Sequence, residues 1–366
     1  MRLHRLKLPG VAYYHVINRI HGGEFLISQL ERERIMLFIR KAEGFCGAQV
    51  LTFAVMSNHF HLLVRIDPPH EVDDAELVQR MGCLYNEDKL CDILEQWKAW
   101  DDAGQCERTE KAKKAMRARM FDLSQFVKTF KELYAMDYNR RTEHVCSVFG
   151  GQRFKSVVVE PTYKTMMTVG TYIDLNPVRA GVVDDPAKSS WNALGKALLK
   201  EGRERDGILE LVRVAYNNRK LNWETARDLY LMAIDGKLVA EPRFRDESTR
   251  PPVRLCPHFT DEQLREAARQ SDSEPIERKY LLRLKVHQFS YGRILGSHEF
   301  VAKVKARNDT EKVCASQPFW QCGDMTLHNG RCMRGPLIVF SEFHVASGQT
   351  SSDGSVVAQS PSRLHG

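Results

Sequence analysis

Several features that would assign the chain to a class of proteins are missing from its sequence. No apolar run approaches the roughly 18 residues of a membrane-spanning helix, so we do not expect an integral membrane protein. The N-terminus is basic but runs into Pro9 and Gly10 instead of a long apolar core, so we expect no secretory signal and a cytoplasmic location. The P-loop pattern G-x-x-x-x-G-K-[ST] does not occur, and no internal repeat is visible.

Cysteine is present, but not in the patterns that form bridges or bind metal. The nine cysteines are an odd set scattered along the chain, with no C-x-x-C pair among them. A disulfide framework and a zinc ribbon both need regular pairs, so neither is predicted. The irregular spacing of the cysteines and histidines after residue 250 disfavours a zinc site there as well.

The chain has an ordinary globular composition with a mild excess of positive charge. Hydrophobic residues make up 43% and charged residues 28% of its 366 residues, and this length fits about two folded domains. The 54 Lys and Arg exceed the 47 Asp and Glu, which gives a net charge of +7. That charge permits a polyanionic partner but does not identify one, because many enzymes with neutral substrates are as basic.

Hydrophobic periodicity predicts strands and a helix near the N-terminus. Runs rich in β-branched and aromatic residues occur at 11–18, 49–56 and 60–66, and the last two are separated by a short turn. Apolar residues at helical spacing occur at 28–45. We therefore expect a strand, a helix and then a β-hairpin or tight strand pair.

Two further helices and a strand complete the pattern. An Asp-x-x-Gln capping box at Asp122 begins a helix that runs to about Arg141. A strand is predicted at 152–160, followed by a helix over 162–175 that Pro177 should end. The resulting order favours an α+β fold with one small, mainly antiparallel sheet covered by helices.

The remaining regions differ in charge, hydrophobic periodicity and composition. A helical insertion is predicted at about 67–120, and its last part is basic. After residue 185 strand signals fade and amphipathic stretches recur, one of them at 260–270, which predicts a mostly helical C-terminal region over 186–345. The segment 346–366 is rich in Ser, Gly and Gln and has no aromatic residue, so we expect a disordered tail.

Two histidines, His59 and His61, stand two positions apart in a strand-like segment. Side chains alternate between the faces of a strand, so both imidazoles point the same way and are close enough to share one metal ion. With 13 histidines in 366 residues, about half an H-x-H pair per chain is expected by chance. The pattern alone therefore fits two histidines on a polar sheet face equally well.

A tyrosine and an asparagine one helical turn apart supply a second feature. Around the end of the helix predicted over 162–175, Tyr172 and Asn176 stand at positions i and i+4 and share a face. An amide oxygen is a reasonable third ligand for a hard divalent ion beside two imidazoles. A phenol can act as a nucleophile when its anion is favoured, although a tyrosine near a helix end more often only packs.

Four blocks of sequence, in a fixed order, carry a resemblance to a known family. They are Tyr14–Val16, Met56–Val64, Gly151–Ser156 and Tyr172–Val183, and they cover about residues 10–185. An H-x-H pair within M-x-N-H-x-H-L-L, joined to Y-x-x-x-N-P-V-R-A-G, is much more specific than either pattern alone. In these blocks the chain resembles the single-tyrosine HUH transposases, in particular the REP-associated tyrosine transposases.

This resemblance implies a catalytic domain over 1–185, with a ferredoxin-like or RRM-like antiparallel sheet. The histidines would lie on a central strand and the tyrosine on a neighbouring helix. It also implies that His59, His61 and Asn176 bind Mg²⁺ or Mn²⁺, and that Tyr172 attacks a phosphodiester of single-stranded DNA. The resulting 5′-phosphotyrosine keeps the energy of the broken bond, so a different 3′-hydroxyl can rejoin strands without ATP.

The same resemblance implies a partner, namely single-stranded DNA hairpins from repeats or element ends. Arg153, Lys155 and Arg179 match basic positions of the family pattern and would contact DNA phosphates. His15 is a weaker candidate for a place near the site. The basic run Lys111–Arg119 in the insertion could grip a hairpin stem, although such runs are usually solvated helix faces. Some relatives assemble the site across a homodimer and others act alone, so both states stay open.

Two other functions fit the same residues. A host-retained protein would bind repeat hairpins without cleaving them and would need neither Tyr172 nor a metal. A ribonuclease or metal-dependent hydrolase would use the histidine pair with water as nucleophile and form no covalent adduct. The segment 291–301 has a weaker resemblance to an element of longer relatives, and it either belongs to a helical DNA-binding unit or packs against the catalytic domain.

Overall fold

The computed structural model describes residues 5–19, 27–143, 149, 153–240, 293–307, 320–322 and 325–328. All of them belong to one compact unit, Met1–Cys332. A second unit, Met333–Gly366, lies outside the described residues, as does the tail predicted at 346–366. No helix within the described part of the chain is long and apolar enough to cross a membrane. The elements are those of an α+β protein, which confirms the predicted class.

The centre of the fold is a sheet with the strand order β2-β3-β1-β4-β5-β7-β6, in which the last three strands are β5 (Ile294–Ser297), β7 (Met325–His328) and β6 (Trp320–Cys322). β1 pairs antiparallel with both β3 and β4, and β2 pairs antiparallel with β3. In β1 only the last residue is exposed, because helices cover both faces of the sheet. The four strands on this side, close to their predicted positions, are β1 (Ala12–Arg19), β2 (Ala48–Val55), β3 (His59–Ile66) and β4 (Lys155–Val159).

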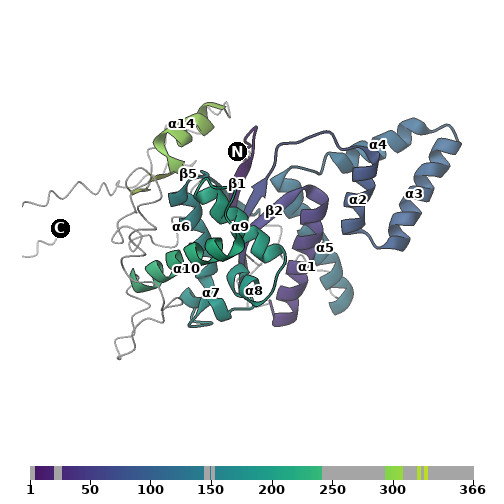
Figure 1. Ribbon diagram of the computed structural model, residues 1–366. Helices are drawn as coiled ribbons and strands as arrows, with labels where there is room; N and C mark the ends of the chain where they lie inside the picture. Colours follow the sequence, from purple (N-terminus) through teal and green to yellow (C-terminus); the bar gives the residue numbers. More distant parts are fainter. Residues whose placement is uncertain are drawn as a thin grey trace, which may run out of the picture. The chain divides into compact units, whose positions relative to one another are not determined.

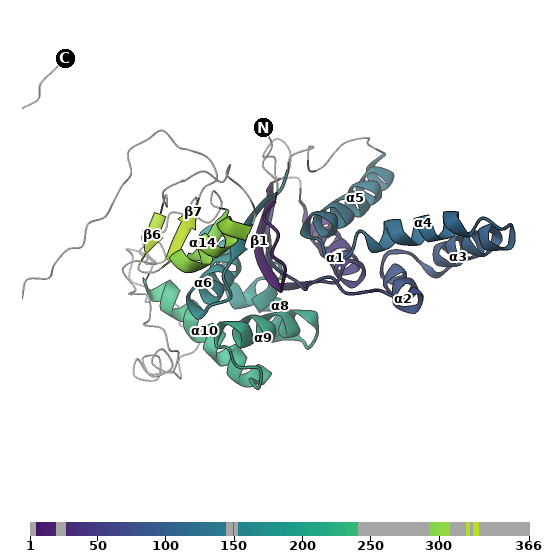
Figure 2. The same ribbon diagram turned by 90° about the horizontal axis from the view of Figure 1, so that it is seen from above.

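One face of the sheet is covered by α1 (Gln29–Cys46) and α5 (Leu123–Thr142), which lie together on one side of β1 in Figure 2. Asp122 caps α5, as predicted, by accepting a hydrogen bond from the backbone of its first turn. Phe60 of β3 packs against Phe130 of α5, with ring centroids 5.6 Å apart. Apolar packing of this kind forms the core on this face.

Further helices cover the opposite face (Figures 1 and 2). The helix predicted over 162–175 ends before Pro177, but the chain continues at once into another helix with this proline in its first turn. Proline is accepted there because amide groups of the first turn have no partner within the helix. The helices are α6 (Tyr163–Asp174), α7 (Asn176–Arg179), α8 (Ala193–Leu199), α9 (Arg203–Ala215) and α10 (Trp223–Ala240).

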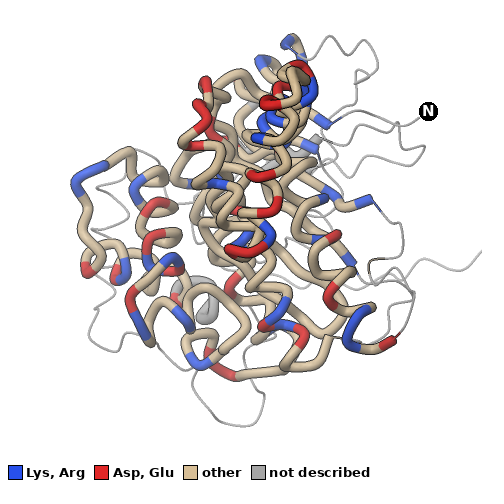
Figure 3. Tube along the Cα trace, turned by 90° about the vertical axis from the view of Figure 1, so that its right-hand side faces the viewer, with Lys and Arg blue, Asp and Glu red and all other residues tan. Residues whose placement is uncertain are grey.

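The insertion predicted at about 67–120 is helical. Its basic part is partly neutralised, because Lys113 and Arg117 both pair with Asp74. Figure 3 shows Lys and Arg interspersed with Asp and Glu on this side of the molecule. The insertion therefore has mixed charge, and not the continuous basic face that gripping a hairpin stem would use. Its helices are α2 (Asp74–Leu84), α3 (Glu87–Asp102) and α4 (Cys106–Arg117).

Strands also occur in the region predicted as mostly helical over 186–345. They were missed because each has only three or four residues, too few for a periodic signal. The first of them pairs in parallel with β4. The stretch predicted as helical at 260–270 lies outside the described residues. The new elements are β5 (Ile294–Ser297), α14 (His298–Arg307), β6 (Trp320–Cys322) and β7 (Met325–His328).

The regions on either side of residue 185 are in contact. Helices α8 and α9 lie against β2, and α9 and α10 lie against α6. β5 extends the same sheet beyond β4. The domain boundary predicted near residue 185 remains a prediction. Residues on both sides of it pack around the sheet face that α6 covers.

Helix α9 approaches the backbone of β2 closely at Gly207. A Cβ at this position would lie 2.6 Å from the carbonyl oxygen of Leu51 and 2.7 Å from that of Val50. Because the helix must then move away from the strand, we expect Gly207→Ala to lower the free energy of unfolding by about 1–3 kcal/mol. Urea denaturation followed by circular dichroism measures the change.

Gly82→Ala in α2 is the matched control. A Cβ at Gly82 meets its nearest neighbour, Leu90, at an ordinary 3.8 Å. Alanine favours an exposed helix by up to about 1 kcal/mol relative to glycine, so this variant should be as stable as the parent or more so. Equal stability of the two variants would contradict the close approach of α9 to β2.

Candidate active site

The two histidines of β3 lie on the sheet face that α6 covers. In the antiparallel register His61 is opposite Ile17, and His59 is opposite Arg19 at the end of β1. The two ring centroids are 5.0 Å apart, as expected for imidazoles on the same face. His61 is 3% exposed, whereas His59 at the end of the strand is half-buried. The pair therefore has one buried member and one that solvent reaches.

Tyr172 of α6 lies against this pair. Its ring centroid is 5.6 Å from that of His61 and 5.8 Å from that of His15, and both contacts are edge to face. The tyrosine side chain is only 2% exposed. Asn176 follows one turn later, and its Nδ2 donates to the carbonyl oxygen of Tyr172 at 2.9 Å. A single chain thus brings His59, His61 and Tyr172 together, with Asn176 tied to the tyrosine backbone.

In both His59 and His61, a hydrogen bond engages Nδ1 and leaves Nε2 for a ligand. His59 Nδ1 lies 2.6 Å from the side-chain oxygen of Asn58, to which it can only donate. His61 Nδ1 lies 3.0 Å from Nε2 of His15 and can donate to it. With the proton on Nδ1, Nε2 keeps its lone pair. Partners of this kind hold metal-binding histidines in one tautomer and orientation.

Burial keeps these imidazoles neutral. It lowers the pKa of His15 to about 3, and burial together with the charge of Arg19 lowers the pKa of His59 to about 4. The pKa of His61 lies well below its ordinary value because of burial, then because of the neighbouring histidines and arginines. The neutral imidazole is the form that binds a metal ion.

The two imidazoles of His59 and His61, together with the side-chain amide of Asn176, form a donor set that suits a hard divalent cation. The described residues contain no group of three His, Cys, Asp or Glu side chains that could hold a metal ion. Two Nε2 atoms and the amide oxygen of Asn176, whose nitrogen donates to the backbone, would supply three protein ligands. Mg²⁺ commonly completes its coordination with water and substrate oxygens. The residues therefore fit Mg²⁺ or Mn²⁺, and their role as ligands remains a prediction.

We expect His61→Ala to weaken Mn²⁺ binding by at least about tenfold, because it removes one of the few protein ligands. Calorimetric titration of the purified protein with Mn²⁺ measures the affinity. His70→Ala is the matched control, since this imidazole is exposed and bonds to Glu76 away from β3. An equal loss in both variants, or no loss in either, would contradict a cation site at β3.

Basic side chains surround the histidines and the tyrosine. The guanidinium carbon of Arg179 lies 5.0 Å from the ring centroid of Tyr172. Besides burial, the charge of Arg19 lowers the pKa of both His59 and Lys155, so Arg19 lies near both. Lys155 and Arg179, two of the predicted DNA-binding residues, thus lie beside the site. Arg19 is not among the residues predicted from the sequence, although alternation along the first strand places it on the histidine face.

A second basic cluster gathers at the start of β4 from distant parts of the chain. The guanidinium of Arg5 lies 3.4 Å from the ring centroid of Phe154 and donates to its carbonyl oxygen at 3.1 Å. The pKa of Arg5 is lowered to about 10, first by burial and then by the charge of Arg153. The same two causes, in the same order, lower the pKa of Arg293. Burial, then Arg5, lowers the pKa of Lys131 to about 8. The predicted Arg153 is therefore one of several cations that only the folded chain brings together.

A buried carboxylate fixes the end of α6. Asp174 accepts hydrogen bonds from the hydroxyl of Tyr230 at 2.6 Å, from that of Thr52 at 2.7 Å and from the amide of Leu194 at 3.0 Å. Burial raises its pKa to about 6, against the lowering effect of these hydrogen bonds. The three partners lie on α10, β2 and α8. This network therefore ties α6 to three other elements two residues from Tyr172.

Comparison with known proteins gives a distant structural similarity but no matching family. No family model matches the sequence, and no curated protein matches it. Among solved structures, one of a REP-associated tyrosine transposase bound to a REP hairpin is similar, with 12% identity and a TM-score of 0.34. The similarity covers 56% of this chain and 88% of that chain. A likeness this distant carries no argument about function, which must come from the residues of this chain.

Proposed function

We propose that the protein is a metal-dependent, transposase-type DNA strand transferase, which cleaves and rejoins single-stranded DNA through a 5′-phosphotyrosine on Tyr172. The observation that carries this proposal is the position of the Tyr172 ring against His61, beside two histidines that present Nε2. A nucleophile and groups that stabilise phosphate charge are what phosphoryl transfer requires within one site. The strand order around β1, with α1 and α5 on one face, supports a ferredoxin-like core.

In the proposed step the phenolic oxygen of Tyr172 attacks phosphorus and loses its proton. The bond between phosphorus and the 3′ oxygen breaks, and that oxygen leaves as a 3′-hydroxyl. The protein then holds the 5′-phosphate as a tyrosine ester. Attack on this ester by the 3′-hydroxyl of another strand forms a new phosphodiester and restores the phenol. One phosphate ester replaces another at each stage, so no ATP is consumed.

A divalent cation is part of the proposal. Mg²⁺ or Mn²⁺, when bound, supplies Lewis-acid stabilisation of charge on the phosphate oxygens. His59, His61 and Asn176 would hold it, while Asn58 and His15 keep the imidazoles in the binding orientation. This arrangement leaves Tyr172 to act as the nucleophile.

Single-stranded DNA hairpins, from repeats or element ends, are the proposed partner. Arg153, Lys155 and Arg179, together with Arg19 and Arg5, would bind backbone phosphates around the site. Because one chain supplies the histidines and the tyrosine, a monomer can hold a complete site, and a homodimer is not required for it.

The test uses purified protein and labelled single-stranded hairpins copied from the DNA that flanks its gene. Reactions with Mn²⁺ or with EDTA are resolved on a denaturing gel. A labelled protein–DNA adduct that forms with Mn²⁺ and not with EDTA is the expected result. Cleavage products without any adduct would overturn the proposal in favour of a hydrolase that uses water.

The burial of Tyr172 favours a second candidate function. With its side chain only 2% exposed, DNA must displace neighbouring groups to reach the phenol. A host-retained protein that binds repeat hairpins without cutting them does not need that access. Hairpin binding in EDTA, with neither adduct nor cleavage in Mn²⁺, would support this alternative.

A further inference from the structure

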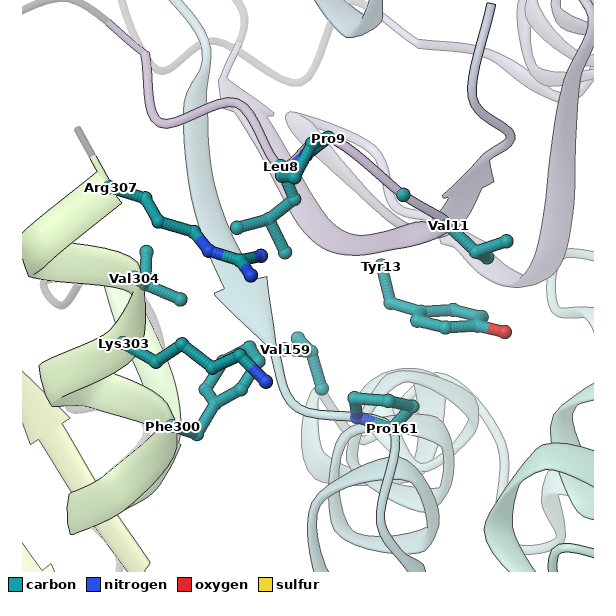
Figure 4. Close-up of a pocket in the computed structure, with 11 residues that line it drawn as sticks. Leu8, Pro9, Val11, Tyr13, Val159, Pro161, Phe300, Lys303, Val304 and Arg307 are labelled. Carbon is teal, nitrogen blue, oxygen red and sulfur yellow. The ribbon is translucent and has the colours of Figure 1, made fainter.

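A pocket lies between the segment that leads into β1 and helix α14, as Figure 4 shows. Its volume is about 180 Å³. Its walls come from three segments that are far apart in the sequence, 8–13, 159–161 and 300–307. None of the residues proposed for catalysis lines it. The pocket is therefore separate from the candidate active site.

Specific contacts fix α14 as one wall of this pocket. The carboxylate of Glu160, just after β4, accepts from the amide of Ser297 at 2.6 Å and from its hydroxyl at 2.9 Å. The same hydroxyl accepts from the amide of Phe300 at 3.2 Å and so caps the helix. A Cβ at Gly296 would lie 2.7 Å from the Phe300 ring and 2.8 Å from Glu160, so the approach is close. The wall is held in place before any ligand binds.

The lining combines apolar surface with two cations. Most of the lining residues are apolar, among them Leu8 and the aromatic Phe300. Figure 4 shows the ammonium group of Lys303 and the guanidinium group of Arg307 directed into the space between these walls. This combination suits a ligand with a flat apolar body and a negative charge.

Acidic groups do not offset this charge within the pocket. No acidic side chain is among the described residues that line it. The adjacent carboxylate, Glu160, is engaged by the amide and hydroxyl of Ser297. The charge that the lining presents is therefore positive, and it complements an anion.

We propose that this pocket binds one unpaired nucleotide of a DNA strand, with the base against the apolar walls and a phosphate on Lys303 and Arg307. The inference rests on the proposed function, which supplies a single-stranded DNA partner. A small pocket of this volume accommodates one ring system but no long apolar chain. Contacts of bases with aromatic rings, and of phosphates with cations, are the usual means of holding single strands.

The position of the pocket gives it a role in substrate placement. It lies at the Tyr13 end of β1, whereas His59 is opposite Arg19 at the other end of that strand. Six residues of extended chain span about 20 Å. A nucleotide in the pocket would thus lie several positions along the strand from a phosphate held at His59. The element 293–307 would then help to set which phosphodiester reaches the tyrosine.

Fluorescence anisotropy of a labelled hairpin with an unpaired extension tests the proposal, with full-length protein in EDTA so that no strand is cut. We expect the double variant Lys303→Ala, Arg307→Ala to bind at least about tenfold more weakly. The slope of log affinity against log salt should fall by about 0.7 for each lost phosphate contact. Lys305→Ala is the control for position, because it removes one positive charge from α14 but does not line the pocket. It should bind within about twofold of the parent.

A steric variant tests the pocket without changing charge. Gly10 lines the pocket, and a Cβ there has no heavy atom within 4 Å, so Gly10→Trp adds a large side chain at the pocket wall without a clash at Cβ. It should lose the affinity that the unpaired extension adds while retaining binding to the hairpin itself. Normal affinity for the extended hairpin in both Gly10→Trp and the double variant would overturn the proposal.

The outcomes separate this inference from the proposed function. If the parent forms the Mn²⁺-dependent adduct and the pocket variants bind DNA as the parent does, only the pocket proposal fails. If the parent binds no single-stranded DNA, both proposals fail. If the pocket variants lose affinity while the parent forms no adduct, the pocket proposal stands and the strand-transfer proposal fails.

Discussion

Tyr172→Phe is expected to abolish the covalent protein–DNA adduct, lowering its rate of formation by at least about 10³-fold. Phenylalanine keeps the ring that packs against His61 and His15 but has no oxygen to attack phosphorus. Hairpin affinity in EDTA should change little, because the basic residues around the site remain. Timed reactions with labelled hairpins and Mn²⁺, resolved on denaturing gels, give the rate.

Tyr163→Phe is the matched control on the same helix. Tyr163 begins α6, and its ring contacts that of Tyr216 at 5.0 Å, not the histidines. Its loss of a hydroxyl should leave the rate of adduct formation within about twofold of the parent. An adduct that persists in Tyr172→Phe, at the rate of the parent, would show that another residue or water is the nucleophile.

Asp174→Ala should lower the free energy of unfolding by about 3–5 kcal/mol, the largest effect on stability that we expect. The substitution leaves the donors of Tyr230, Thr52 and Leu194 buried without their acceptor. It also opens space at the point where α6, α8, α10 and β2 meet. Urea denaturation followed by circular dichroism measures the loss.

Asp174→Asn separates the loss of hydrogen bonds from the loss of charge. Its amide keeps one oxygen for Leu194, and its NH₂ group can donate to the hydroxyls of Thr52 and Tyr230, which can also accept. We therefore expect Asn to cost clearly less than Ala. Equal losses for the two variants would contradict the role given to this hydrogen-bond network.

The raised pKa of Asp174 also predicts a pH dependence. The folded state, in which this pKa is about 6, binds the proton more tightly than the unfolded state, in which the pKa is about 4. The contribution of Asp174 to stability therefore rises as the pH falls from about 7 to 4. Asp174→Asn removes this contribution, so the parent should gain stability relative to the Asn variant over that range.

The part of the fold that sequence predicts well rests on local patterns. Strands β1 to β4 and helices α1, α5 and α6 have runs long enough for their periodicity to show, and Asp122 marks the start of α5. The shared face of His59 and His61 follows from strand alternation alone. These features depend on neighbours within a few residues, and a single sequence displays such neighbours directly.

The remaining features depend on contacts between distant residues. Strand β5 has four residues, and it is a strand because β4 offers a free edge for pairing. Arg5 and Arg293 come near Arg153 only after the chain folds, so nothing in their local sequence marks them. In the sequence Asp174 is one polar residue within an apolar helix, and only the folded chain places Tyr230 and Thr52 beside it. Sequence therefore indicated the central chemistry of the site better than its surroundings.

The parallel pairing of β5 with β4 has a consequence for synthesis on the ribosome. β5 is made about 135 residues after β4, which takes on the order of 10 s at typical rates of translation. During that interval the outer edge of β4 has unpaired backbone groups, and such edges promote pairing with other chains. Newly made molecules thus pass through an aggregation-prone stage, and a chain truncated before residue 293 would stay in it.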